Sequence, residues 1–147
     1  SGTLRDNVSL GQDDCTEDHI VESLKAAGAD FIGEGDGSAL EFFIQDQGSN
    51  LSGGQKQAVM IARALAFKPD VFLFDEPTSA MDGFTEAQVI NHLSSELTNQ
   101  TLIIVTHKMP VVAMCDRVIV MDQGKIIGDG SKDAYFDLLK KRSEQKV

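Results

Sequence analysis

The sequence predicts an α/β fold with a short parallel sheet, a crossover helix, a helical N-terminal part, and a C-terminal β-hairpin and helix. Two short, continuous apolar runs, at residues 71–74 and 102–105, are typical of parallel strands that are covered on both faces. Between these runs, residues 85–97 repeat apolar side chains at helical spacing. The three segments together predict a strand–helix–strand unit, which is right-handed by default.

The N-terminal third is predicted to be helical and rich in loops. Thr16 is expected to cap a helix that ends near Gly28. The inner face of this helix would carry Ile20, Val21 and Leu24. Three glycines then interrupt regular structure, at Gly33, Gly35 and Gly37. The apolar run at residues 40–44 fits no element clearly.

The remaining elements follow from local signals. A helix is predicted from Gly53 to a point before Pro69, since proline disfavours helix at the residue before it. Residues 117–121 and 125–127 predict a hairpin whose turn contains a glycine. Ser131 is expected to cap a last helix. The inner face of that helix would carry Tyr135, Leu138 and Leu139.

Composition narrows the class of protein. The chain has 147 residues, of which 41% are hydrophobic and 24% charged, as in an ordinary globular domain. No apolar run reaches the roughly 18 residues that a membrane span needs. Cys15 and Cys115 lie far apart and are expected to be free thiols. Of a net charge of −10, residues 1–50 contribute −9, which argues against nucleic acid as a partner. We interpret this acidity as a solvated face, the alternative being a docking surface for a basic partner.

The segment from Ser52 to Gln55 is a candidate phosphate-binding turn. Gly53 and Gly54 would let backbone N–H groups approach an anion closely, and the helix behind them would direct its positive end to the same point. The Ser52 hydroxyl and the Gln55 amide are further candidate donors. The alternative is an ordinary Ser-Gly-Gly loop without a ligand.

Two adjacent acids, Asp75 and Glu76, follow the first predicted strand, at the edge where open α/β sheets bind ligands. Neighbouring residues on a strand point to opposite faces, so the two acids would have different roles. We expect Asp75 to bind Mg²⁺, commonly through water. Glu76 would polarise the water molecule that attacks a phosphoryl group. The alternative is a strand that ends in solvated acids.

His107 follows the second predicted strand with one residue between them. We expect its side chain to face the same ligand-binding crevice, at the sheet edge, as Asp75 and Glu76. There it would hydrogen-bond a γ-phosphate and help to hold the water against Glu76. The other two histidines, His19 and His92, belong to no such constellation and are interpreted as incidental. Their spacing does not indicate a metal site.

Four segments, in this order and spacing, resemble the motifs of the ATP-binding-cassette (ABC) ATPases. They are residues 51–55, similar to the signature motif; residues 71–76, similar to Walker B; residues 77–82, similar to the D-loop; and residues 106 and 107, similar to the H-loop. Residues 1–8 also resemble the segment after the Q-loop in exporter-type cassettes. Gln47 departs from the Glu-Arg-Gly usual in the exporter X-loop, which weakens the expected contact with a transmembrane domain.

The resemblance implies a helical signature subdomain at residues 1–68 and part of a P-loop ATPase core at residues 69–147. It also implies a head-to-tail dimer of nucleotide-binding domains, with ATP and Mg²⁺ as cofactors. The signature turn and Asp82, a D-loop acid at the subunit interface, would contact nucleotide held mainly by the partner. Arg63 would form a structural ion pair. The domain would serve a transmembrane partner at the cytoplasmic face of a membrane.

One part of the family pattern is absent: no G-x-x-x-x-G-K-[ST] loop occurs in the chain. The P-loop lysine, the aromatic residue that stacks on adenine and the Q-loop glutamine would all precede Ser1. We therefore expect the C-terminal part of an exporter-type cassette, inactive alone. The alternatives are a non-transport ABC ATPase of the DNA-repair or chromosome type, which a basic patch or heptads would favour, and a non-catalytic interaction module. The cargo stays open.

Overall fold

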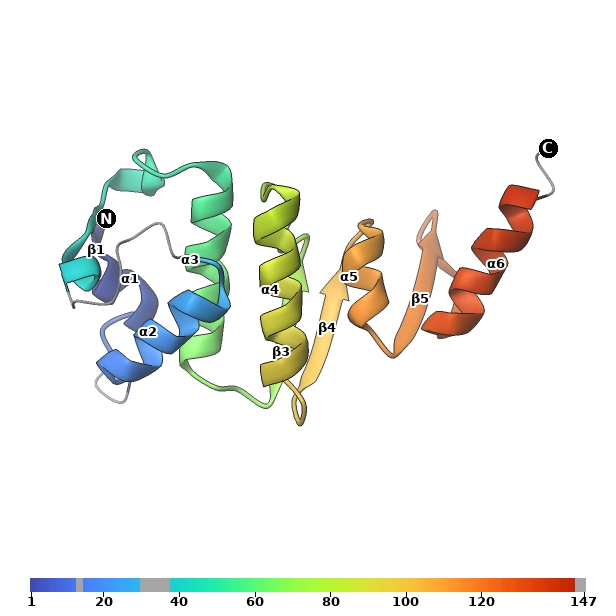
Figure 1. Cartoon of the computed structure of the whole chain (residues 1–147), viewed down its shortest axis with the longest axis horizontal. Coiled ribbons are helices and arrows are strands. Elements are labelled where there is room, and N and C mark those ends of the chain that lie inside the picture. Colours follow the sequence, from blue (N-terminus) through green and yellow to red (C-terminus); the bar gives the residue numbers. More distant parts are fainter. Residues whose placement is uncertain (13–14, 30–37, 145–147) are drawn as a thin grey trace. The chain divides into compact units, whose positions relative to one another are not determined.

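The computed structural model describes residues 1–12, 15–29 and 38–144 (Figure 1). It divides into two compact units, Ser1–Val105 and Thr106–Val147, and each is described by itself below. The predicted boundary between residues 68 and 69 lies inside the first unit and stays a prediction about functional subdomains. The predicted breaks at Gly33, Gly35 and Gly37 lie outside the described residues. No described helix combines the length and the apolarity that crossing a bilayer requires.

The first unit begins with a pairing that joins two distant segments. Strand β1 (Gly2–Thr3) pairs antiparallel with β2 (Phe43–Ile44), next to the short helix α1 (Leu4–Ser9). The apolar run at 40–44 is therefore divided between the 3-10 helix η2 (Ser38–Glu41) and β2. Because each strand is only two residues long and the partners are far apart in sequence, no local pattern indicates this pairing.

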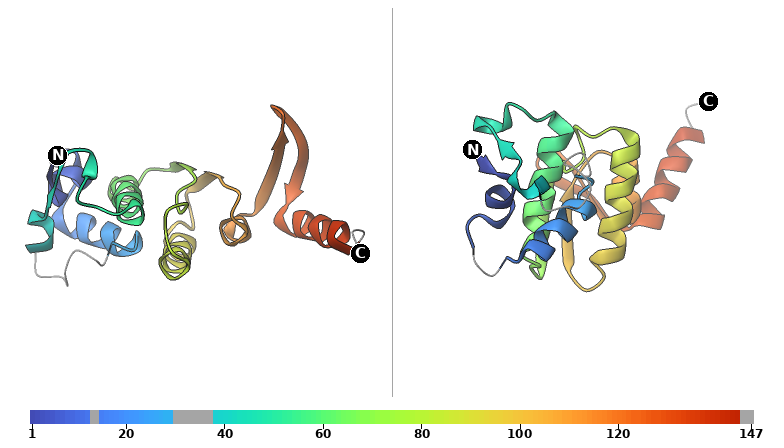
Figure 2. Two further views of the ribbon diagram at one scale, coloured as in Figure 1. Left: turned by 90° about the horizontal axis from the view of Figure 1, so that it is seen from above. Right: turned by 60° about the vertical axis from the view of Figure 1, so that its left-hand side comes forward.

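Helix α2 (Glu17–Ala26) confirms the predicted cap, because the Thr16 hydroxyl accepts a hydrogen bond from the His19 N–H at 3.3 Å. Its inner face buries Ile20 and Leu24. The helix ends as predicted, just before Gly28, whose φ of +68° is left-handed. Helix α2 packs against α3 (Gly53–Ala66), which also contacts α1, as the views in Figure 2 show.

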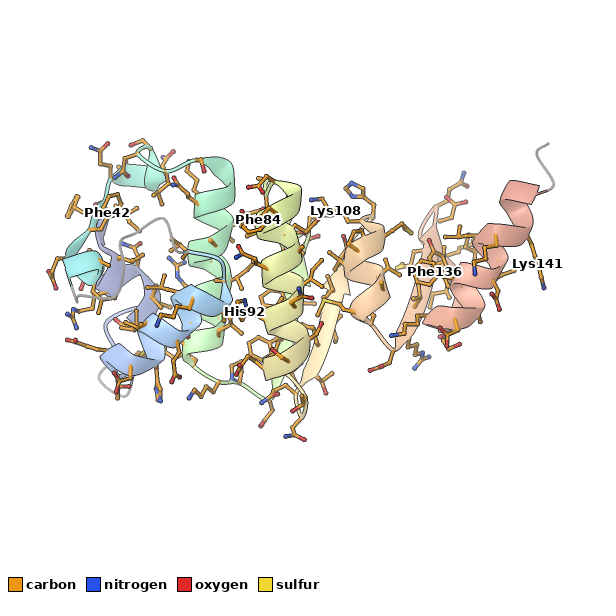
Figure 3. All side chains as sticks on the ribbon, viewed as in Figure 1. Phe42, Phe84, His92, Lys108, Phe136 and Lys141 are labelled. Carbon is orange, nitrogen blue, oxygen red and sulfur yellow. The ribbon has the colours of Figure 1, made fainter. Side chains whose placement is uncertain are left out.

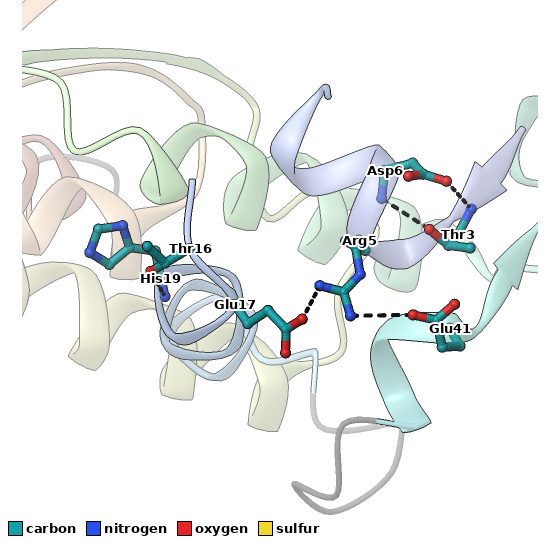
Figure 4. Close-up of polar contacts among 7 residues, drawn as sticks. All are labelled: Thr3, Arg5, Asp6, Thr16, Glu17, His19 and Glu41. Carbon is teal, nitrogen blue, oxygen red and sulfur yellow. Dashed lines mark hydrogen bonds and ion pairs between the residues drawn. The ribbon is translucent and has the colours of Figure 1, made fainter. Parts of the chain in front are cut away.

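One arginine connects three of these elements (Figure 4). Arg5 of α1 donates hydrogen bonds to Glu17 at the start of α2 and, at 3.3 Å, to Glu41 in η2. The hydrogen bond to Glu17 raises the pKa of Arg5 above its ordinary value. Two of the acids in the N-terminal third, Glu17 and Glu41, therefore have a local structural role, because both bind the guanidinium group of Arg5.

The predicted strand–helix–strand unit is present. Strand β3 (Val71–Asp75) pairs in parallel with β4 (Thr101–Val105), and α4 (Gly83–Glu96) connects them. The register runs from Val71 opposite Thr101 to Asp75 opposite Val105. Helix α3 ends before Pro69, as predicted.

The prediction that both faces of these strands are covered is wrong for the described chain. Phe72 and Phe74 are buried, but Leu73 on the other face is 72% exposed and Ile103 beside it 51%. Among the described residues this sheet has two strands, and the first unit covers one of its faces. The core of the first unit lies on the covered side and between the helices. Its fully buried members include Leu4, Val8, Ile20, Leu40, Ala62 and Val89.

The second unit contains α5 (Met109–Met114), the hairpin of β5 (Arg117–Asp122) and β6 (Lys125–Ser131), and α6 (Lys132–Glu144). The hairpin is confirmed. Its turn has left-handed backbone at Gln123 and Gly124, the pattern of a type I′ turn, whose twist matches that of the strands. The predicted cap is also confirmed, since the Ala134 N–H donates to the Ser131 hydroxyl at 3.3 Å.

Helix α6 corrects one prediction, because Leu138 is 59% exposed instead of facing inward. The half-buried face is centred on Tyr135, Phe136 and Leu139, and helical spacing puts Leu138 at its edge. The rings of Tyr135 and Phe136 lie edge to face, 5.8 Å apart, and Figure 3 shows Phe136 on α6. Cys15 and Cys115 form no disulfide, as expected. Burial raises the pKa of the Cys115 thiol.

Candidate functional site

The N-terminus of α3 is closed by a reciprocal capping box. The Ser52 hydroxyl accepts from the Gln55 N–H at 3.2 Å, and the Gln55 side-chain oxygen accepts from the Ser52 N–H at 2.8 Å. Each helix leaves four N–H groups without an intrahelical partner at its start. The box satisfies two of them, so within the described chain the N–H groups of Gly53 and Gly54 remain for a ligand.

The same box determines which side-chain groups are available. It uses the Ser52 hydroxyl oxygen and the Gln55 side-chain oxygen as acceptors, so the Ser52 O–H and the Gln55 side-chain NH₂ remain as donors in the described part of the chain. Four donors thus surround the positive end of a fourteen-residue helix. An anion is the ligand that this arrangement suits.

Gly53 and Gly54 also have a packing role that the sequence interpretation missed. A Cβ atom at Gly53 would lie 3.1 Å from the Ala80 Cβ, and one at Gly54 would lie 3.0 Å from the Ala80 carbonyl oxygen. In the structure, the start of α3 therefore closely approaches the turn that follows β3, at residues 76–81. The two glycines allow α3 and this turn to meet.

A surface hollow of about 520 Å³ lies where α3, this turn and the start of α4 meet. The described residues that line it are Gly28, Ser52, Gly54, Gln55, Ala80, Met81, Asp82, Phe84, Thr85 and Gln88. The structure therefore brings Ser52, Gly54 and Gln55 to the same surface as Asp82. Phe84, at the start of α4, is labelled in Figure 3 and is 74% exposed.

Asp82 is the N-cap of α4. One of its carboxylate oxygens accepts from the Phe84 N–H at 2.9 Å and the Thr85 N–H at 3.0 Å, and the other accepts from the Thr85 hydroxyl at 2.8 Å. The hydrogen bonds from Thr85 are the main reason that the pKa of Asp82 lies below its ordinary value. The sequence signal for this cap, an aspartate just before an apolar periodic segment, was present but was not used. Contact of Asp82 with nucleotide stays a prediction.

Asp75 and Glu76 lie where they were predicted, at the carboxyl end of β3. Asp75 is the last strand residue, is exposed, and pairs with Val105 of β4. Glu76 is half-buried and lies beyond the strand, with a left-handed φ of +45°. Strand alternation therefore does not apply to Glu76, which lies outside β3. Its left-handed backbone is uncommon for a residue other than glycine.

The turn after Glu76 is held from inside by a buried pair. The Thr78 hydroxyl donates to the Glu86 carboxylate at 2.5 Å, and the two residues are 2% and 9% exposed. A hydrogen bond between buried groups is costly to break, because a buried polar group then loses a partner. This contact fixes the turn against the first turn of α4.

Three other predicted residues have different outcomes. Arg63 donates from Nε to the Asn7 backbone carbonyl at 2.7 Å, and its expected ion pair stays a prediction. His107 is exposed and belongs to the second unit, and its role beside Glu76 stays a prediction. Gln47, in the 3-10 helix η3 (Asp46–Gly48), has a left-handed φ of +52°, and its contact with a membrane domain stays a prediction.

The remaining two histidines are not among the described residues that line the hollow. His92 is exposed on α4 (Figure 3), with Nδ1 3.0 Å from the Gln88 carbonyl. His19 lies in the first turn of α2. The described residues contain no group of three or more His, Cys, Asp or Glu side chains that could enclose a metal ion. Asp75 therefore remains the single-carboxylate candidate for Mg²⁺, a cation that usually keeps several waters and substrate phosphates as ligands.

Comparison with known proteins gives a consistent result. The family model described as ABC transporter matches residues 3–79. The ATP-dependent lipid A-core flippase of Neisseria gonorrhoeae is 39% identical over 94% of this chain and 23% of its own length. The leukotoxin export ATP-binding protein of Aggregatibacter actinomycetemcomitans is 37% identical over 94% of this chain and 19% of its own length.

A solved structure agrees with these relatives. The structure of a bacterial Atm1-family ABC exporter with ATP bound matches with a TM-score of 0.83 and 33% identity, over 95% of this chain and 24% of that chain. The chain thus spans about a quarter of the length of the exporter it matches.

Proposed function

Because the chain belongs to the ABC transporter family, we propose that it binds and hydrolyses ATP as the C-terminal part of a nucleotide-binding domain that powers export across a membrane. One observation carries this proposal. The first unit holds a helix N-terminus with two N–H groups left for an anion, and a strand that ends at Asp75 and is followed by Glu76. Phosphate contacts and carboxylates are the parts that phosphoryl transfer to water requires.

In the proposed assembly, two nucleotide-binding domains form a head-to-tail dimer. The Gly53 and Gly54 N–H groups, the Ser52 hydroxyl and the Gln55 amide donate to phosphate oxygens of ATP held mainly by the partner domain. Asp82 lies at the edge of the same hollow, where the two domains meet. The capping box supports this role, because it fixes the donors before the anion arrives.

The hydrolytic groups act on the domain's own nucleotide. Asp75 would hold Mg²⁺, commonly through water, and when bound the ion would supply positive charge beside the phosphates. Glu76 orients and polarises the attacking water, and His107 hydrogen-bonds the γ-phosphate. Support for a catalytic Glu76 comes from its backbone, since non-glycine residues with left-handed φ are concentrated at functional sites.

The wider assembly follows from the relatives. Two proteins similar to this chain are named for export or flipping, and the chain covers less than a quarter of each. We propose that a transmembrane domain is the mechanical partner, that the cassette lies at the cytoplasmic face, and that nucleic acid is no partner. Phosphate binding needs the P-loop of the complete cassette, so the 147-residue chain alone is expected to hydrolyse ATP negligibly.

Steady-state ATP hydrolysis by the longer protein, P-loop included, tests this function. Glu76→Gln removes the polarising carboxylate while keeping the shape, and the rate is expected to fall about 10²- to 10⁴-fold. Glu96→Gln, a matched change at the exposed end of α4, is expected to keep the rate. An unchanged rate in Glu76→Gln would overturn the proposal.

A further inference from the structure

We infer that Gln57 is a positioning residue. It connects the start of α3, where residues 52–55 form the phosphate-covering turn, to the backbone of Glu76. The inference rests on the proposed function, because it gives Gln57 a role through the hydrolytic carboxylate. Gln57 lies on α3, two residues after Gln55, and is half-buried. It did not figure in the sequence interpretation.

The side-chain amide of Gln57 uses both of its polar atoms on the turn after β3. Its Nε2 donates to the Glu76 carbonyl oxygen at 3.1 Å and to the Ser79 hydroxyl at 2.7 Å. Its Oε1 accepts from the Ala80 N–H at 2.8 Å. One side chain thus spans the whole turn and fixes its distance from α3.

The contact matters because of the backbone conformation of Glu76. Its φ of +45° is unfavourable for a residue with a side chain, and such conformations persist only when the surroundings hold them. The Val105 carbonyl holds the Glu76 N–H at 2.8 Å, and the Ser79 N–H donates to the Glu76 carbonyl at 3.2 Å. Gln57 supplies the third contact, which is the one that comes from α3.

A second contact runs parallel to the first. A Cβ atom at Gly54 would lie 3.0 Å from the Ala80 carbonyl oxygen, so the start of α3 lies directly against the same turn. Any shift of α3 relative to this turn must change the Gln57 hydrogen bonds or the Gly54 contact. The start of α3 and the backbone of Glu76 are therefore mechanically linked within one unit, through Gln57.

Two substitutions separate the roles of this amide. Gln57→Met removes the donor and the acceptor at similar length, whereas Gln57→Glu keeps an acceptor for the Ala80 N–H and loses the donor to Glu76. Gln100→Met is the matched control, at a half-buried glutamine before β4. Thermal unfolding of each variant checks the fold; if Gln57→Met does not fold, Gln57→Glu carries the test.

The first measurement is made on the 147-residue chain and needs no ATP hydrolysis. By NMR, Gln57→Met is expected to speed hydrogen exchange at the Ala80 amide about tenfold or more, the effect of losing one hydrogen bond in a fixed turn. Gln57→Glu is expected to keep Ala80 protected. Both variants are expected to move the Glu76 backbone resonances, which report its left-handed φ. Unchanged Ala80 exchange and Glu76 resonances in Gln57→Met would overturn the inference.

The second measurement is ATP hydrolysis by the longer protein. Both Gln57 variants are expected to lower kcat about 10- to 100-fold, as for a misplaced catalytic group, with the KM for ATP changed less than about twofold. Gln100→Met is expected to keep kcat. If Glu76→Gln abolishes hydrolysis but both Gln57 variants retain wild-type kcat, the inference fails and the function stands. If Glu76→Gln has no effect, the function fails, and the NMR measurement still decides whether Gln57 holds the turn.

Discussion

Gly54 and Ala80 approach so closely that a Cβ atom on Gly54 would lie 3.0 Å from the Ala80 carbonyl oxygen. Backbone cannot move aside as a flexible side chain does, so Gly54→Ala must push α3 away from the turn after β3. We expect this substitution to destabilise the chain by about 1–3 kcal/mol, the usual cost of overpacking. Chemical denaturation of the 147-residue chain measures the effect.

Gly83→Ala is the matched control for this prediction. Gly83 is the first residue of α4, and a Cβ there meets nothing within 4 Å. Alanine at a compatible position stabilises by about 0.4–1 kcal/mol through the unfolded chain. Equal destabilisation by the two substitutions would show that the Ala80 contact is not the cause.

The lowered pKa of Asp82 predicts that the chain loses stability at acid pH. Its pKa lies below the ordinary 3.8, so its charged form is favoured by folding. This stabilisation is present above about 3.8 and is lost as the pH falls through the folded-state pKa. Asp82→Asn keeps a good helix cap without a titrating group. The free energy of unfolding of this variant should therefore depend less on pH below about 3.8, and the helix should remain capped at neutral pH. An identical pH profile in the two proteins would contradict the assignment.

Loss of the buried contact between Thr78 and Glu86 is expected to lower the stability of the chain. Thr78→Val keeps the shape and removes the hydroxyl that donates to the carboxylate at 2.5 Å. We expect a destabilisation of about 1–3 kcal/mol in denaturation, because a buried polar group loses a partner. Thr78→Ser should recover most of it. Thr101→Val, on an exposed strand position, should change stability by less than about 0.5 kcal/mol.

In the second unit, Arg117 and Asp129 form a bidentate pair across the hairpin, with N–O distances of 2.7 and 2.6 Å. These hydrogen bonds lower the pKa of Asp129 below its ordinary value. An NMR titration of Asp129 should therefore show a low pKa, which Arg117→Met returns toward 3.8. A pKa that is the same in both proteins would mean that the pair does not persist in solution.

Elements with local signals were predictable from the sequence. The caps at Thr16 and Ser131 and the hairpin turn are each determined by a few neighbouring residues, and all are confirmed. The pairing of β1 with β2 was missed because its partners are distant and each strand is two residues long. The exposure of Leu73 was missed because an apolar run does not reveal which of its faces the same chain covers.

The candidate site divides in the same way. Ser52, Gln55, Asp75 and Glu76 were predicted as candidate site residues from motif spacing, since their residue types are themselves the signal. The hydrogen bonds of Gln57 to Glu76 and Ala80 were not, because they join segments about twenty residues apart through one side chain. The left-handed backbone of Glu76 could not be predicted either, because glutamate disfavours this conformation and its presence in the sequence does not indicate it.

The central claim is that Glu76 supports cleavage of ATP by the complete cassette, and single-turnover chemistry tests it most directly. The longer protein would be mixed with a limiting amount of γ-labelled ATP and Mg²⁺, quenched at intervals, and assayed for bound ATP and released phosphate. The account predicts that Glu76→Gln retains bound, uncleaved ATP while the wild type converts it to ADP. Phosphate release at the wild-type rate from Glu76→Gln would contradict it.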